Sequence, residues 1–164
     1  MKLENFVIAC KRLIWTGVLC IVASQAHSQE LPIGVQSSLI DFDNRLIIEM
    51  SISNLGDSPL RFYRADLPWG NKYSTLLLLV RPGKRTSFLE QAQYIDVPGP
   101  ETIAIEKTQI VNGAIDVYRL FPDLNSERKK TDFLLFWAYN AKDLSGNTSR
   151  HFGGMYALPK LLPK

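Results

Sequence analysis

Cysteine and histidine are scarce in this 164-residue chain, and most of them lie near its start. Cys10, Cys20 and His27, one of two histidines, all fall within the first 28 residues. No apolar run reaches the roughly 20 residues that span a bilayer. If residues 1–28 are removed, the remaining domain has no thiol for nucleophilic or redox chemistry, and its one imidazole is His151.

Residues 1–28 have the three-part pattern of a secretory signal peptide. Three basic residues precede an 11-residue apolar run, Leu13 to Ala23. In Ala26-His27-Ser28, small residues then occupy the −3 and −1 positions of a cleavage site. We therefore expect a periplasmic or secreted protein, cut after Ser28 or Ala26, with no membrane attachment after cleavage. A lipidated Cys20 and an uncleaved signal anchor are the alternatives.

Acidic and basic residues nearly balance in the predicted mature domain, residues 29–164. It has 136 residues with 16 basic and 15 acidic side chains, so its net charge is +1, against +3 for the whole chain. Such a domain has no electrostatic reason to bind nucleic acid. Its length suits a single domain whose core can form without disulfides. An exported domain without cysteine is more typical of a bacterial periplasm than of small secreted animal proteins.

Alternating apolar residues predict an all-β fold. Residues 45–53 place Leu46, Ile48, Met50 and Ile52 on one face, as in a half-buried strand. Residues 74–81 are apolar on both faces, which predicts a central strand covered on both sides. Further strands are predicted at residues 38–42, 60–64, 94–97, 101–106, 109–118, 133–139 and 155–158. Together they indicate an immunoglobulin-like antiparallel β-sandwich of seven to nine strands over residues 29–159, followed by a flexible tail, residues 160–164.

One short helix is predicted at Asp123 to Lys130. The segment has no apolar stripe, so we expect about two turns on the surface of the domain. Its basic end, Arg128-Lys129-Lys130, suits the negative end of a helix dipole and is expected to be solvated.

Three segments between Ile47 and Tyr139 carry a likeness to a known family. The first segment is a strand followed by residues 54–60, a second strand and the turn Pro68-Trp69-Gly70. The second is Ile103-Ala104-Ile105 followed, after a turn, by Ala114-Ile115-Asp116-Val117. The third is the strand at 133–139. In this order they resemble the immunoglobulin-like region that precedes the catalytic domain of deuterolysin-type zinc peptidases. Lys107-Thr108 and the shorter turn at Pro68 depart from the family pattern.

The resemblance implies a fold and not an activity. A zinc peptidase of that kind needs two histidines on a helix, with a glutamate between them, and a further ligand. The predicted mature chain has only His151. We therefore expect the accessory module without its catalytic domain, and neither a metal nor another cofactor.

The most distinctive segment of the predicted mature chain is RADLPWGNKY, residues 64–73. Tyrosine, tryptophan and arginine often dominate interface energies, and loops at the end of a sandwich commonly carry binding sites. We predict a surface for another exported protein, made by Arg64, Asp66, Trp69, Lys72 and Tyr73 together with Arg150 and His151. For Trp69 itself we favour a compatible alternative, in which the ring folds back over the core.

Catalysis would have to use His151 or a pair of carboxylates. His151 lies in a polar loop, and no nucleophile motif points to it. Asp41 and Asp43 flank a turn, where aspartate is common for structural reasons. The predicted function is therefore a non-enzymatic exported binding module. An inhibitor or immunity protein of an exported hydrolase is one alternative, and an enzyme using His151 is the other.

Overall fold

The computed structural model describes residues 30–162 except 43, 72 and 84–99. Eight strands occur in this part: β1 Ile33–Phe42, β2 Arg45–Asn54, β3 Leu60–Tyr63, β4 Thr75–Val80, β5 Thr102–Ile105, β6 Ile110–Asp116, β7 Phe133–Tyr139 and β8 Phe152–Leu158. The helical turns are short: η2 Arg64–Asp66, α2 Val117–Leu120 and α3 Leu124–Glu127. The predicted signal peptide and the strand predicted at 94–97 lie outside the described residues.

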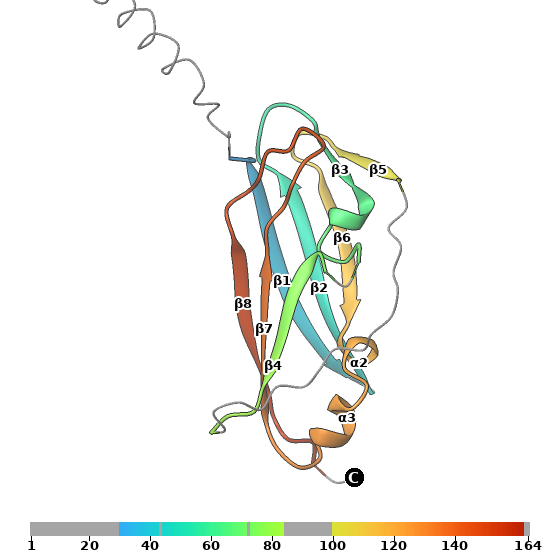
Figure 1. The fold of residues 1–164 in the computed structure, drawn as a ribbon, viewed down its shortest axis with the longest axis vertical. Coiled ribbons are helices and arrows are strands. Elements are labelled where there is room, and N and C mark those ends of the chain that lie inside the picture. Colours follow the sequence, from blue (N-terminus) through green and yellow to red (C-terminus); the bar gives the residue numbers. More distant parts are fainter. Residues whose placement is uncertain (1–29, 43, 72, 84–99, 163–164) are drawn as a thin grey trace, which may run out of the picture.

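Two three-stranded antiparallel sheets, β1-β2-β6 and β4-β7-β8, face each other, and β3 pairs with β5 (Figure 1). The predicted all-β sandwich is confirmed. Within the described range, no helix is long and apolar enough to cross a membrane.

The core lies between the two sheets and follows the predicted period of two. Every second residue of β2, from Leu46 to Ile52, is buried. The same holds for β7, where Phe133, Leu135, Trp137 and Tyr139 point inward. The Tyr156 hydroxyl of β8 donates a hydrogen bond of 2.6 Å to Ser37 Oγ of β1, which joins the sheets.

Strand β4 does not occupy the position that its sequence predicts. In the described part of the chain β7 is the middle strand of its sheet and β4 lies at the edge. Leu77 and Leu79 are buried, whereas the side chains of Leu76 and Leu78 are 67% and 39% exposed. The prediction of a central strand covered on both faces is therefore wrong, because an apolar face need not be a covered one.

The predicted helix at Asp123 to Lys130 is shorter and more buried than expected. Only Leu124–Glu127 forms α3, and both Leu124 and Arg128 are completely buried. The predicted surface position is wrong for these two side chains, and Arg128 is not solvated. A second helical turn, α2, replaces the end of the strand predicted at 109–118.

Helix α2 begins where a side chain caps its N-terminus. The Asp116 carboxylate accepts a hydrogen bond of 3.1 Å from the backbone N–H of Arg119. Such a cap satisfies one of the N–H groups that lack a partner in the first helical turn. Strand β6 therefore ends at Asp116.

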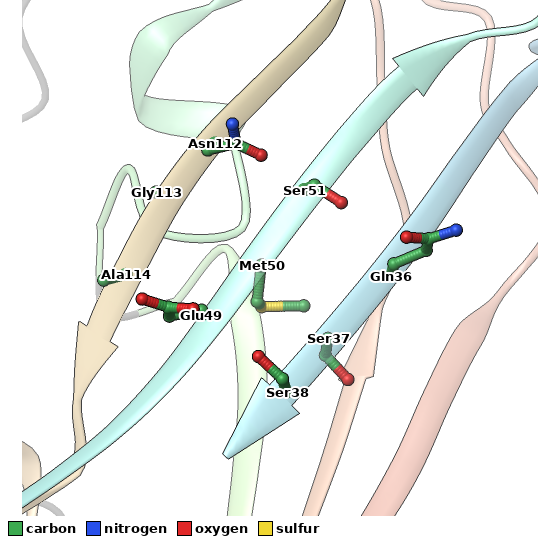
Figure 2. Close-up of a pocket in the computed structure, with 9 residues that line it drawn as sticks. All are labelled: Gln36, Ser37, Ser38, Glu49, Met50, Ser51, Asn112, Gly113 and Ala114. Atoms are coloured by element: carbon green, nitrogen blue, oxygen red, sulfur yellow. The ribbon is translucent and has the colours of Figure 1, made fainter. Parts of the chain in front are cut away.

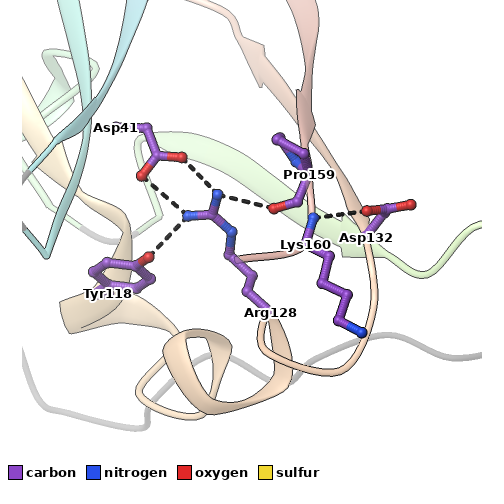
Figure 3. A network of polar contacts seen from close by, with 6 residues as sticks. All are labelled: Asp41, Tyr118, Arg128, Asp132, Pro159 and Lys160. Carbon is purple, nitrogen blue, oxygen red and sulfur yellow. Dashed lines mark hydrogen bonds and ion pairs between the residues drawn. The ribbon is translucent and has the colours of Figure 1, made fainter. Parts of the chain in front are cut away.

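Arg128 connects three distant parts of the chain (Figure 3). Its Nη1 and Nη2 donate to the two carboxylate oxygens of Asp41, at 3.2 and 2.5 Å. Nη1 also donates to the Tyr118 hydroxyl at 2.8 Å, and Nη2 to the Pro159 carbonyl at 3.2 Å. The Nε atom has no hydrogen-bond partner among the described residues.

The electrostatic balance keeps Arg128 charged. Burial disfavours the guanidinium, but the hydrogen bond with Asp41 and the neighbouring Tyr118 oxygen outweigh it and raise the pKa of Arg128. The same corner attaches the start of the predicted tail. The N–H of Lys160 donates to Asp132, and that of Leu161 to the Arg128 carbonyl.

Candidate functional site

The loop between η2 and β4 is braced by the side chain of Asn71. Its Oδ1 accepts hydrogen bonds from the N–H groups of Tyr73 at 2.7 Å and Ser74 at 3.1 Å. Its Nδ2 donates to the Ala65 carbonyl at 2.6 Å. Asparagine is favoured in such turns because its side chain reaches backbone groups two and three residues ahead. Asn71 therefore connects the backbone of Tyr73 and Ser74 to that of Ala65 at the start of the loop.

Trp69 covers the core. Its indole is half-buried and packs against the hydrophobic cluster. The ring lies directly against Gly113 of β6, where a Cβ atom would come within 2.1 Å of it. Only a glycine at position 113 leaves room for this ring. The favoured interpretation of Trp69 matches this arrangement, and only part of the ring can face a partner.

Of the other residues predicted in this loop, Tyr73 is the most exposed. Its side chain is 76% exposed. Arg64 forms an exposed ion pair with Glu101, at 3.4 Å between Nε and Oε2. Asp66 is half-buried, and its backbone carbonyl accepts a hydrogen bond of 2.9 Å from the Tyr139 hydroxyl. Lys72 lies outside the described residues.

The Tyr139 hydroxyl, which donates to this loop, has a strongly raised pKa. Burial raises the pKa far above its usual value, and the nearby negative charge of Asp66 adds to the effect. The hydroxyl therefore stays protonated and remains a hydrogen-bond donor to the loop.

Arg150 and His151 belong to the loop between β7 and β8. The Arg150 guanidinium lies 5.1 Å from the centre of the Phe152 ring, which is a cation–π arrangement. His151 is exposed. Thr75 pairs with Tyr139, and Tyr139 with Phe152, so both predicted loops lie at the same end of the β4-β7-β8 sheet. Among their described residues, no hydrogen bond or ion pair joins the two predicted groups.

A concavity that the sequence did not predict lies on the outer face of the β1-β2-β6 sheet (Figure 2). Its volume is about 610 Å³. Two cross-strand rows in its lining carry its polar side chains: Gln36, Ser51 and Asn112 form one row, and Ser38 and Glu49 form the other together with the apolar Ala114. The lining has amide, hydroxyl and carboxylate groups but no aromatic ring, which suits hydrogen bonding to water or a polar ligand. The lining residues come from three strands that are distant in the sequence, so the concavity could be recognised only once the pairing register of these strands was known.

The residues considered for catalysis are not assembled in the described part of the chain. Asp41 lies in β1, one residue before the strand ends, and its carboxylate binds Arg128. Asp43 lies outside the described residues. The described residues contain no group of three histidine, cysteine or acidic side chains close enough to hold a metal ion.

Comparisons with known proteins add little. No family model matches the chain, and neither does any curated protein. One solved structure is titled "X-ray structure of Northeast Structural Genomics Consortium target SoR45". It aligns with 80% of this chain and 88% of its own, at 15% identity and a TM-score of 0.36. A likeness at this level supports no conclusion about function, and the resemblance to the deuterolysin-type region stays a prediction.

Proposed function

We propose that this protein is an exported, non-enzymatic module that binds another protein through the loops at residues 64–74 and 140–151. The observation that carries the proposal is Tyr73, an aromatic side chain that is 76% exposed on a loop braced by Asn71. Most other large rings of the described residues contribute to the core, so this exposure is not the general pattern.

A braced loop is a favourable platform for recognition. Binding must offset the entropy of ordering the side chains and loops that make contact. The N–H groups of Tyr73 and Ser74 are already hydrogen-bonded to Asn71, which lowers this cost. Tyrosine also offers a large contact area with few rotatable bonds and a hydroxyl that can hydrogen bond. Arg150 at the same end of the sheet adds a cation.

Two further features support the proposal. The charged start, apolar run and small residues of positions 1–28 favour export. His151, the one histidine of the predicted mature domain, is exposed and lies outside the concavity on the β1-β2-β6 sheet.

Site-specific photo-cross-linking in the cell of origin tests the proposal. A photoreactive phenylalanine analogue replaces Tyr73 in one version of the chain and Phe42 in another. Phe42 is a matched control, because it is 77% exposed and lies at the opposite end of β1 from this loop end (Figure 1). We expect a discrete protein adduct from position 73 and none from position 42. Adducts of equal yield from both positions, or none from either, would contradict a binding site at this end.

A further inference from the structure

Strand β1 lies at an edge of its sheet. It pairs with β2 over ten residues without a bulge, and no described strand pairs with its other side. Edge strands of natural proteins are commonly protected by lysine, proline, inward-pointing charges or bulges. Residues 34–40 contain no charged residue and no proline. This stretch of β1 is therefore a long, regular edge without these protections.

The hydrogen-bond pattern shows which backbone groups face this free edge. The Pro32 carbonyl accepts a hydrogen bond of 2.8 Å from the N–H of Leu55, in continuation of the β1–β2 ladder. Hydrogen-bonded and non-hydrogen-bonded pairs alternate along such a ladder, so the N–H and C=O groups of Val35, Ser37 and Leu39 point away from β2. No described backbone group bonds to them. Each of these residues therefore offers one donor and one acceptor to another extended chain.

The core is incompletely covered beside this edge. Val35 and Leu39 point inward but are only half-buried, whereas Ile48 of β2, opposite Leu39, is completely buried. On the facing sheet, Phe152 and Tyr156 of β8 also point inward and are half-buried. In Figure 1, β8 lies beyond β1 on this side of the sandwich, with no described strand of the other sheet behind it. One further strand beside β1 would therefore face β8 and cover these half-buried side chains.

The side chains along the edge define what such a strand must carry. Neighbouring residues of paired strands point to the same face of a sheet. Beside Val35 and Leu39 the added residues should therefore be apolar. Beside Ser37 the added residue should be small, because the Tyr156 hydroxyl already occupies this place and donates to Ser37 Oγ at 2.6 Å.

A second copy of the chain does not fit this place. Joining two β1 strands into one continuous sheet, with both apolar sides inward, would bring the two overhanging β8 strands into the same space (Figure 1). A single extended segment has no second sheet and avoids this conflict.

We infer that the free edge of β1 binds one extended segment of a partner protein, about five residues long, beside residues 35–39. Strand addition of this kind takes affinity from main-chain hydrogen bonds and specificity from alternate side chains. The segment does not reach Phe42, the control position for the loop end. The inference does not rest on the contact through Tyr73, so each can fail without the other.

A photoreactive phenylalanine analogue at position 36 of the full chain, introduced in the cell of origin, tests this inference. Position 112 is the matched control, because Gln36 and Asn112 are exposed amides of one cross-strand row, on β1 and on β6. We expect an adduct from position 36 alone, attached to a partner segment with apolar residues at alternate positions. No adduct from position 36, equal adducts from both positions, or attachment to a second copy or to another part of the same chain would overturn the inference.

Amide hydrogen exchange, followed by NMR, tests the backbone contact with a synthetic peptide of the attached sequence. In the free protein the amide protons of Val35, Ser37 and Leu39 should exchange rapidly, whereas those of Gln36 and Ser38, which face β2, should exchange slowly. Saturating peptide should slow exchange at the first three positions at least about tenfold. Unchanged exchange at these three positions would overturn the inference.

Two variants at position 37 separate the backbone contact from the side chain. Ser37→Pro removes an N–H that faces away from β2, which an edge strand tolerates. Ser37→Ala removes the same hydroxyl, with its bond to Tyr156, but keeps the N–H. We expect Ser37→Pro to weaken peptide binding at least about tenfold and Ser37→Ala by less than about twofold. Equal peptide affinities of the two variants would overturn the inference, and the exchange measurement decides if the proline variant does not fold.

Discussion

Removing either partner of the Asp41–Arg128 pair should destabilise the domain, but by unequal amounts. The two side chains differ in their access to water: that of Arg128 is 1% exposed and that of Asp41 is 34% exposed. Truncating one partner of a buried ion pair typically costs about 3–5 kcal/mol, because the remaining charge stays buried without compensation. The cost therefore depends on which charge remains.

In Asp41→Ala the guanidinium remains, enclosed and with only Tyr118 and the Pro159 carbonyl as acceptors. We expect a loss of about 3 kcal/mol in the free energy of unfolding, near the lower end of that range because these two bonds persist. In Arg128→Met the partly exposed carboxylate can regain water, so we expect about 1–2 kcal/mol. The double variant should be more stable than Asp41→Ala alone, since no buried charge is left.

Urea unfolding of the purified protein and the three variants measures these differences in the free energy of unfolding. The midpoints should shift while the slope stays constant, so that differences in midpoint report stability. The double-mutant cycle should give a coupling energy of about 2 kcal/mol. Equal losses in both single variants, with an additive double variant, would refute the argument from unequal burial.

Two further predictions concern the core beneath the loop end. Gly113→Ala places a methyl group against the Trp69 ring, so we expect a loss of about 1–3 kcal/mol in the free energy of unfolding and a red-shifted tryptophan emission. An unchanged melting temperature would contradict the contact. Tyr139→Phe removes the hydrogen bond to the Asp66 carbonyl and should cost about 1 kcal/mol at pH 7. The pKa of Tyr139 is higher in the folded than in the unfolded protein, so its contribution is complete below about pH 10 and is lost as the pH rises above that value. Thermal unfolding between pH 8 and 11 should therefore show a steeper alkaline loss in the unchanged protein than in Tyr139→Phe, and parallel curves would contradict the assignment.

The strands of this fold could be predicted because their period of two is local information. Residues 45–53 and 133–139 alternate around a buried face, and both form strands with that face inward. The same pattern does not reveal what covers a face. Residues 75–80 are apolar on both sides, yet β4 lies at the edge of its sheet in the described part and presents Leu76 to solvent.

The burial of Arg128 and the contact of the Trp69 ring with Gly113 could not be predicted, because both depend on partners far away in the sequence. Arg128 reads as a solvated charge until Asp41, 87 residues earlier, is placed beside it. The Trp69 ring fits only because Gly113 of β6 has no side chain. By contrast, the residue types of the 64–73 segment placed Tyr73 among five candidate residues, and Tyr73 is the most exposed of those that the structure describes.

The affinity of the module for the partner that cross-links to position 73 tests the central proposal most directly. Isothermal titration of the purified pair compares Tyr73→Ala with Phe42→Ala, which removes an equally exposed aromatic ring from the opposite end. The proposal predicts that Tyr73→Ala raises the dissociation constant at least about tenfold, as expected for an aromatic anchor, while Phe42→Ala leaves it unchanged. An unchanged dissociation constant for Tyr73→Ala, or equal weakening by both variants, would contradict recognition through this loop.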